Sequence, residues 1–180
     1  NNINTSKEGT NKIRHEDGGP AFYSQERIGK NEKPFKMWKF RSMVVNADQM
    51  IDQLEDQNEI EGAMFKIKDD PRITKIGKNL RKTSLDELPQ LLNILKGDMS
   101  IIGPRPVVEK ELNKFGNGQD LLLSVKPGLT GLWACSGRSD TTYEKRVKKE
   151  LYYAENYSMK LDLLCFFKTC LSVVKGTGAR

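Results

Sequence analysis

The sequence predicts an α+β fold, a single and mostly helical domain with a small β-hairpin or sheet. Apolar residues recur at helical spacing in several short segments, which glycines and prolines separate. Two aromatic-rich runs flank one turn-forming stretch, as in a hairpin. With 180 residues, the chain is long enough to bury one core. Neither an internal repeat nor a change in composition points to a second domain.

The N-terminal residues 1–14 differ from the rest in being polar and without periodicity. Their sequence, NNINTSKEGTNKIR, predicts a polar tail or a cloning-derived segment. The folded domain is then expected to span 15–180. A hairpin is expected between Gly18 and Met43, where GKNEKP separates the two aromatic runs.

Helices are expected in much of the rest of the chain. NADQMIDQLEDQNEI predicts a helix capped by Asn46 or Asp48, and the basic segment after it has apolar residues at helical spacing. Residues 86–95 predict a helix that Gly97 closes. Pro89 then lies in its first turn, where the missing N–H costs little.

The C-terminal half combines short extended segments with helices. SIIGPRP predicts a short strand or extended piece, VVEKELNKFG a helix ended by Gly116, and VKPGLTGLW a turn-rich loop. From 142 to 175 the pattern is helical, with a break near Asn156. Its apolar face from Leu163 to Val174 would either pack on the core or lie at a membrane interface, with lysines near anionic headgroups.

The composition favours an anionic partner. Lys and Arg total 30 against 24 for Asp and Glu, which gives a net charge of +6. Nucleic acid, an anionic membrane surface or a phosphorylated substrate would suit this charge, and so would a plain solvated surface. KPFKMWKFR could stack on a single-stranded nucleic acid, but a strand with its aromatics packed inward is the simpler interpretation.

Several kinds of site are excluded. The chain has one histidine, His15, so a histidine triad or a histidine zinc site cannot form. Its three scattered cysteines make no disulfide framework and fit a reducing compartment. No stretch approaches the ~18 apolar residues of a spanning helix.

Two adjacent carboxylates, Asp86 and Glu87, are the first candidate for chemistry. With Ser84 they form S-x-x-E, the pattern of a capping box, which predicts an ordinary acidic helix start. The same position would favour ionised Asp86 and make it an available nucleophile. Neighbours on a helix point about 100° apart, so they cannot face each other across a sugar as glycosidase carboxylates do.

A nucleophile beside a ligand for Mg²⁺ suits this adjacency better, because Mg²⁺ takes few protein oxygens and the rest from water and phosphate. Arg105 lies between two prolines that fix the backbone on both sides. It would either hold phosphate oxygens with its guanidinium or be a surface arginine in a kinked loop.

Three long motifs carry a resemblance to a known family: FKMWKFRSM, DDPRITKIGKNLRKTSLDELPQLLNILKGDMSIIGPRP and KPGLTGLWACSGRSD. In this order they resemble the bacterial sugar transferases, the monotopic polyprenol-phosphate phosphoglycosyl transferases, over nearly all of 15–180. The resemblance implies the catalytic fold of that family. It also implies a Mg²⁺-dependent transfer of a sugar-phosphate from a UDP-sugar to undecaprenyl phosphate, at the cytoplasmic face of the bacterial inner membrane.

The resemblance also implies roles for single residues. Asp86 would attack the β-phosphate and carry the sugar-phosphate, Glu87 with Asp86 would hold Mg²⁺, and Arg81, Lys82 and Arg105 would bind phosphates. The donor pocket would include Lys39, Arg41, Pro104, Pro106 and Arg138. UDP-galactose is the favoured donor, with UDP-glucose or an N-acetylated sugar as the alternative. The partners expected are the donor, the lipid phosphate and the membrane surface, without nucleic acid. A basic nucleic-acid-binding module or a scaffold is the non-enzyme alternative.

Two departures from the family pattern stand out. The family has a hydrophobic membrane segment before GGPAFYSQERIG, where this chain has its polar residues 1–14. We therefore expect the chain to be the catalytic globule without that segment, with weak or absent activity on a long-chain lipid. Ala134 and Cys135 stand where the family usually has Gln-Val.

Overall fold

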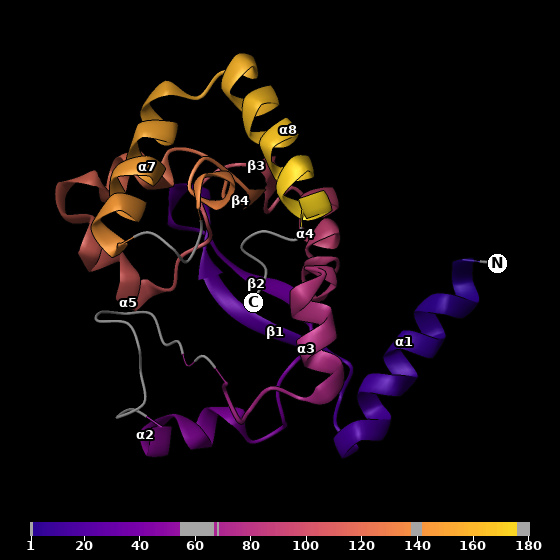
Figure 1. Cartoon of the computed structure of the whole chain (residues 1–180). Helices are drawn as coiled ribbons and strands as arrows, with labels where there is room; N and C mark the ends of the chain where they lie inside the picture. The colour runs from indigo at the N-terminus through magenta and orange to yellow at the C-terminus, as the bar shows by residue number, and fades with distance from the viewer. Residues whose placement is uncertain (1, 55–66, 68, 138–141, 176–180) are drawn as a thin grey trace. The chain divides into compact units, whose positions relative to one another are not determined.

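The computed structural model describes residues 2–54, 67, 69–137 and 142–175 (Figure 1). They are mixed helix and small sheets, as the sequence predicts. They divide into two compact units. The first contains Asn1–Tyr23 and Lys39–Leu88, and the second contains Ser24–Trp38 and Pro89–Ala179.

The predicted hairpin is confirmed. Strands β1 (Phe22–Ile28) and β2 (Pro34–Phe40) pair in a two-stranded sheet, and the short turn η1 (Lys30–Glu32) connects them. At the open end, which belongs to the first unit, the rings of Phe22 and Phe40 lie 5.2 Å apart. The aromatic residues of this segment therefore contribute packing to the hairpin.

The first unit begins with a helix, α1 (Asn2–Asp17), where a tail was expected. Ile13 is buried, and the Glu16 carboxylate accepts the backbone N–H groups of Lys75 and Ile76 at 2.5 and 3.1 Å. Those N–H groups open the helix α3 (Lys75–Lys82), so Glu16 satisfies donors that have no partner within that helix. Tertiary contacts of this kind hold a polar segment that has no strong helical pattern of its own.

Other elements of the first unit are short. The expected helix at Asn46 begins as the 3₁₀ turn η2 (Ala47–Met50) and continues as α2 (Ile51–Leu54), without a side-chain cap from Asn46. Its predicted remainder lies outside the described residues. Thr74 caps α3 by accepting the N–H of Gly77 at 2.9 Å.

In the second unit, two three-residue strands form a parallel pair. β3 (Ser100–Ile102) was expected, whereas β4 (Gly128–Thr130) lies in the segment that the sequence predicted to be only a loop. The prediction was wrong because close backbone approach, rather than side-chain pattern, makes this pair. A Cβ on Gly128 would lie 2.1 Å from the nitrogen of Gly103.

Helices surround this small sheet (Figure 1). They are α4 (Gln90–Lys96), α5 (Glu109–Leu112), α6 (Gln119–Leu123), α7 (Tyr143–Asn156) and α8 (Met159–Lys175), with the 3₁₀ turns η5 (Asn113–Gly118) and η6 (Ala134–Ser136). The predicted break near Asn156 is confirmed. Gly97 ends α4 with φ 85°, a left-handed conformation that suits glycine, as predicted.

Two apolar clusters form the core of the second unit. One gathers Ile102, Tyr153 and Cys165, and the other gathers Val107, Phe115 and Leu122. The buried amide of Asn93 ties α4 to β2, since it accepts the N–H of Trp38 and donates to the carbonyl of Lys36.

Helix α8 packs against β3 and β4 through a narrow stripe that includes Cys165. Most of its large apolar side chains are exposed instead: Leu163, Leu164, Phe166, Phe167 and Leu171. The alternative that this face of the helix packs on the core is therefore correct only for the stripe around Cys165. Among the described residues, every helix is too short or too polar to cross a bilayer.

Candidate active site

The two carboxylates lie in η4 (Leu85–Glu87), a 3₁₀ turn that follows α3 and packs against it in the first unit. The predicted capping box is absent: Ser84 has φ 56° and makes no capping hydrogen bond with its side chain. An N-cap needs an extended backbone, whereas the left-handed Ser84 turns the chain from α3 into η4. The predicted helix over 86–95 accordingly starts later, at Gln90.

Asp86 is buried, with 9% of its surface exposed. Burial raises the pKa of its carboxyl, the Lys39 charge opposes this rise, and the neighbouring Glu87 adds to it. The expectation that a helix start favours the ionised form is therefore wrong, because desolvation has the larger effect. Within the described residues, Asp86 has no ion pair.

Glu87 is in a different state from its neighbour. Its Oε1 accepts a hydrogen bond from Lys39 Nζ at 2.8 Å, and both side chains are partly exposed. Lys39 comes from the end of β2, 48 residues earlier. The lysine charge thus holds one carboxylate directly and acts on the second through space.

Arg81 is the third charged group of this cluster. Its Nε donates to Ser42 Oγ at 2.9 Å, the single hydrogen bond of the guanidinium in the described part of the chain. Burial lowers the pKa of Arg81, and the nearby Asp86 charge opposes that shift. Arg81 is half-buried and, among the described residues, has no carboxylate partner within 4 Å, so its guanidinium can bind an anion.

Two other basic residues predicted for the site differ in what they contact. Arg41 is buried, and its three nitrogens are all hydrogen-bonded within the first unit. Two of these bonds go to the Asp17 carboxylate, so Arg41 holds α1 to the end of β2. Lys82 is exposed at the end of α3, directly after Arg81.

The Pro-Arg-Pro segment belongs to the second unit and has a fixed backbone. Arg105 N–H donates to Glu150 Oε1 at 3.1 Å, and the carbonyls of Pro104 and Pro106 accept from Gly128 N and Arg27 Nη1 at 2.8 and 3.1 Å. Pro104 and Pro106 are buried. Each residue of the segment thus has a different hydrogen-bond partner. These bonds fix the backbone from which the Arg105 side chain extends.

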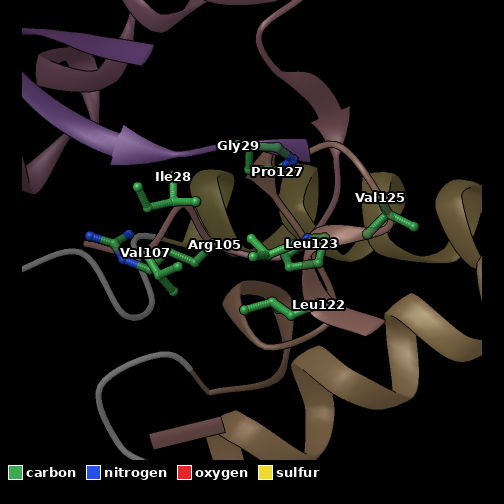
Figure 2. A pocket seen from close by; sticks show the side chains of 9 residues that line it. Ile28, Gly29, Arg105, Val107, Leu122, Leu123, Val125 and Pro127 are labelled. Atoms are coloured by element: carbon green, nitrogen blue, oxygen red, sulfur yellow. The ribbon is translucent and has the colours of Figure 1, made fainter. Parts of the chain in front are cut away.

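A small pocket adjoins this segment, with an interior about the size of one water molecule. Figure 2 shows the side chains around it, from the end of β1, from the segment at Arg105 and from α6. Their labels include Ile28, Val107 and Leu122, which pack together in the core. The pocket is therefore a small packing defect lined in part by Arg105, and it is too small for a sugar nucleotide.

Sequence reasoning missed Glu150 and its neighbours. Glu150 has 1% of its surface exposed, and burial raises its pKa to about 7. Trp133 lies close to two guanidiniums, with Arg105 Cζ 5.9 Å and Arg146 Cζ 5.1 Å from its ring centroid. The available signal was the i, i+4 spacing of Arg146 and Glu150 on the helical face that also carries Tyr153.

The structure thus brings Asp86, Glu87, Lys39 and Arg81 together in the first unit. Arg105 belongs to the second unit, and Arg138 lies outside the described residues. In the described part of the chain no three acidic, cysteine or histidine side chains form a metal cluster.

Residues 10–176 match the family described as "Bacterial sugar transferase". The chain belongs to this family. The buried Asp86, Glu87 and their charged neighbours lie within the matched residues of this sugar transferase domain.

Relatives of known name support the same family. "Undecaprenyl-phosphate galactose phosphotransferase" of Salmonella typhimurium is 47% identical over 91% of this chain and 35% of its own length. "Exopolysaccharide production protein ExoY" of Sinorhizobium fredii is 46% identical over 93% of this chain and 76% of its own length. "UDP-N-acetylgalactosamine-undecaprenyl-phosphate N-acetylgalactosaminephosphotransferase" of Aeromonas hydrophila is 39% identical over 93% of this chain and 38% of its own length. The chain spans about a third of the first of these relatives.

Proposed function

We propose that this domain transfers a hexose-1-phosphate from a UDP-sugar to undecaprenyl phosphate through a covalent intermediate on Asp86. One observation carries the proposal: a buried carboxylate, which has no ion pair among the residues that the structure describes, lies beside the Lys39–Glu87 pair and Arg81. Such a carboxylate is poorly solvated, so less water must be displaced when it attacks a phosphorus atom. The product would serve the assembly of a capsule or exopolysaccharide.

In the first step, an Asp86 oxygen attacks the β-phosphorus of the UDP-sugar. A P–O bond to the carboxylate forms, the bond from that phosphorus to the bridging oxygen breaks, and UMP leaves with the electron pair. The sugar-phosphate remains on Asp86 as an acyl phosphate. Only the ionised carboxylate is a nucleophile, and the Lys39 charge favours that form because it opposes the rise in the pKa of Asp86 that burial causes.

In the second step, a phosphate oxygen of undecaprenyl phosphate attacks the same phosphorus. The bond to Asp86 breaks, the carboxylate is regenerated, and the lipid carries a diphosphate-linked sugar. The same fixed carboxylate is thus the nucleophile of the first displacement and the leaving group of the second, and two in-line displacements leave the configuration at phosphorus retained.

Arg81 and Arg105 are assigned to the phosphates, with Lys82 as a weaker, exposed contributor. Charge develops on the phosphoryl oxygens during each displacement, and fixed guanidiniums stabilise it without reorganisation. The fixed backbone at Pro104 and Pro106 supports such a role for Arg105. Arg41 is left out of the donor pocket, because its guanidinium is already fully hydrogen-bonded.

Mg²⁺ is proposed as the metal, held by Glu87 together with Asp86. The donor set fits, because Mg²⁺ in phosphate-handling sites uses one or two carboxylates and completes its shell with water and phosphate. Lys39 contacts Oε1 of Glu87, so its ammonium would share that carboxylate with a cation. When bound, the ion would neutralise charge on the diphosphate.

Galactose-1-phosphate is the proposed group, with glucose-1-phosphate and N-acetylhexosamine-1-phosphate as the alternatives. Support comes from the 47% identity to a relative named for galactose, against 39% to one named for N-acetylgalactosamine. A panel of UDP-sugars scored by UMP release tests this. Turnover with an N-acetylated donor alone would overturn the galactose assignment.

A membrane surface is proposed as the place of reaction, on the cytoplasmic side of the bacterial inner membrane. The lipid acceptor requires one, and exposed apolar side chains of α8, with Lys160 and Lys168 nearby, support contact with anionic headgroups. α4 adds three exposed leucines, Leu91, Leu92 and Leu95. Flotation with anionic vesicles tests this, and absence of binding at low salt would contradict it.

The test of the proposed function is Asp86→Asn, which keeps size and removes the nucleophile. UMP release should fall by about 10³-fold or more, since a removed nucleophile typically costs this much. The variant should remain folded, as judged by circular dichroism. Wild-type turnover in the variant would contradict the mechanism.

A further inference from the structure

Ser42 is hydrogen-bonded at both ends of α3, the helix that carries Arg81. It lies just beyond the end of β2 and is buried. Its carbonyl accepts the N–H of Thr74 at 3.1 Å, and its hydroxyl accepts Arg81 Nε–H at 2.9 Å. The first contact is at the N-cap of the helix and the second is in its last turn, so one residue fixes both ends of α3.

Gly77 makes this arrangement sterically feasible. A Cβ at Gly77 would lie 2.0 Å from the carbonyl oxygen of Ser42, so any larger residue would push the helix away. Gly77 is buried one turn before Arg81. The backbone contacts therefore set the distance of α3 from Ser42, and the hydroxyl then reaches Nε without an intervening water.

The bond to Nε determines how the guanidinium is presented. The group is planar, with Nε on one edge and both terminal nitrogens at the far end. An acceptor on Nε fixes the plane and leaves the terminal nitrogens for a second acceptor. Asp86, Asp70 and Glu87 attract the Arg81 charge, yet none of them is within 4 Å of it. Without Ser42, the guanidinium could turn toward one of these carboxylates.

We propose that Ser42 is a positioning residue for Arg81. Its hydroxyl holds Nε so that the terminal nitrogens face the donor's phosphoryl group and stay away from the three nearby carboxylates, those of Asp70, Asp86 and Glu87. This rests on the proposed function, because that function supplies the phosphate that Arg81 would bind. The role belongs to the hydroxyl of Ser42, whereas its backbone builds the fold.

The separation of hydroxyl from backbone makes a clean test. Ser42→Ala removes the hydroxyl and keeps the carbonyl contacts, so the melting temperature should stay close to that of the wild type. For UMP release from UDP-galactose with Mg²⁺, kcat should fall about 10-fold, as for loss of one hydrogen bond to a charged group. KM should change by less than about twofold, because the charge that Arg81 meets grows in the transition state. Ser42→Thr, which keeps a hydroxyl, should restore most of kcat.

A double-mutant cycle with Arg81→Lys separates positioning from structure. Lysine lacks the Nε–H of a guanidinium, so adding Ser42→Ala to Arg81→Lys should cause no further loss of kcat. Ser124→Ala is the control, because the Ser124 hydroxyl donates to the local carbonyl of Leu121, and its removal should leave kcat unchanged.

The outcomes distinguish the two proposals. If Arg81→Lys impairs UMP release while Ser42→Ala does not, or if the two losses multiply independently, the role of Ser42 is wrong and the proposed function stands. If the wild-type chain neither releases UMP nor binds UDP in calorimetry, the proposed function fails and this inference with it.

Discussion

The two arginines assigned to phosphate are held in opposite ways. Arg81, in the first unit, is held by its side chain, through one hydrogen bond from Nε to Ser42. Arg105, in the second unit, is held by its backbone, through Glu150 and the bonded carbonyls on either side, while its guanidinium lies over Trp133. A hydrogen bond to the side chain fixes the orientation of the guanidinium directly. Hydrogen bonds to the backbone fix only the position from which the side chain extends, so its guanidinium is less constrained.

Substituting the arginines themselves should have the largest effect. Arg81→Ala and Arg105→Ala are each expected to lower kcat for UMP release by about 10²–10³-fold, the usual cost of one charge-stabilising donor. The stability effects should differ. Arg81 is a half-buried charge that has no carboxylate within 4 Å in the described part of the chain, so its removal should leave the melting temperature unchanged or higher. If only one of the two substitutions lowers kcat, the other arginine has no role at the phosphates.

Glu150 provides the backbone counterpart of the Ser42 test. Glu150→Ala leaves the buried N–H of Arg105 without its acceptor, which costs about 1–3 kcal/mol of stability. We expect kcat to fall about 10-fold along with the melting temperature, because both depend on the same segment. Glu150→Gln keeps an acceptor oxygen and should retain most activity. Equal losses in the two variants would mean that the charge matters rather than the hydrogen bond.

The Glu150 carboxyl also predicts how stability depends on pH. Its folded pKa of about 7 lies above the ordinary value of 4.5, so the fold favours the neutral form. That contribution is fully present below about pH 4.5 and is lost as the pH rises through 7. Glu150→Gln cannot ionise, so its melting temperature relative to the wild type should increase between pH 5 and 8. A difference that stays constant across this range would contradict a raised pKa.

Lys39→Met should have a smaller effect, visible in the pH profile. The Lys39 charge lowers the pKa of Asp86, so without it that pKa should rise further. The acidic limb of the kcat–pH profile should then shift to higher pH, with activity partly recovered in alkaline buffer. Lys82→Met removes an exposed lysine from α3 and is the matched control, for which no shift is expected. If the profile of Lys39→Met is not shifted, the Lys39 charge does not control the ionisation of Asp86.

Local signals predicted some elements and failed for others. The hairpin turn, the glycine that closes α4 and the break near Asn156 are marked by residue type, and all three were correct. The polar α1 depends on Glu16 meeting α3, 59 residues away, which no local pattern indicates. The capping box failed because its pattern specifies residue types, while the left-handed backbone of Ser84 depends on how α3 and η4 pack.

Some residues of the candidate site were likewise predicted from local sequence signals, whereas others were missed. Asp86, Glu87 and Arg81 were found because they are close in sequence and carry the motif. Ser42 and Glu150 were missed because each contacts its arginine across about 40 residues of chain, 39 in one case and 45 in the other. Asp86 was expected to be easily ionised from its place near a helix start, but its burial is a tertiary property and reverses that expectation.

The covalent role of Asp86 is the central claim and can be measured directly. The chain is incubated with UDP-galactose and Mg²⁺ without lipid acceptor, quenched, and analysed by intact-protein and peptide mass spectrometry. We expect one added hexose-phosphate on the peptide that contains Asp86, formed together with UMP and absent in Asp86→Asn. UMP release without any adduct, or an adduct that persists in Asp86→Asn, would contradict it.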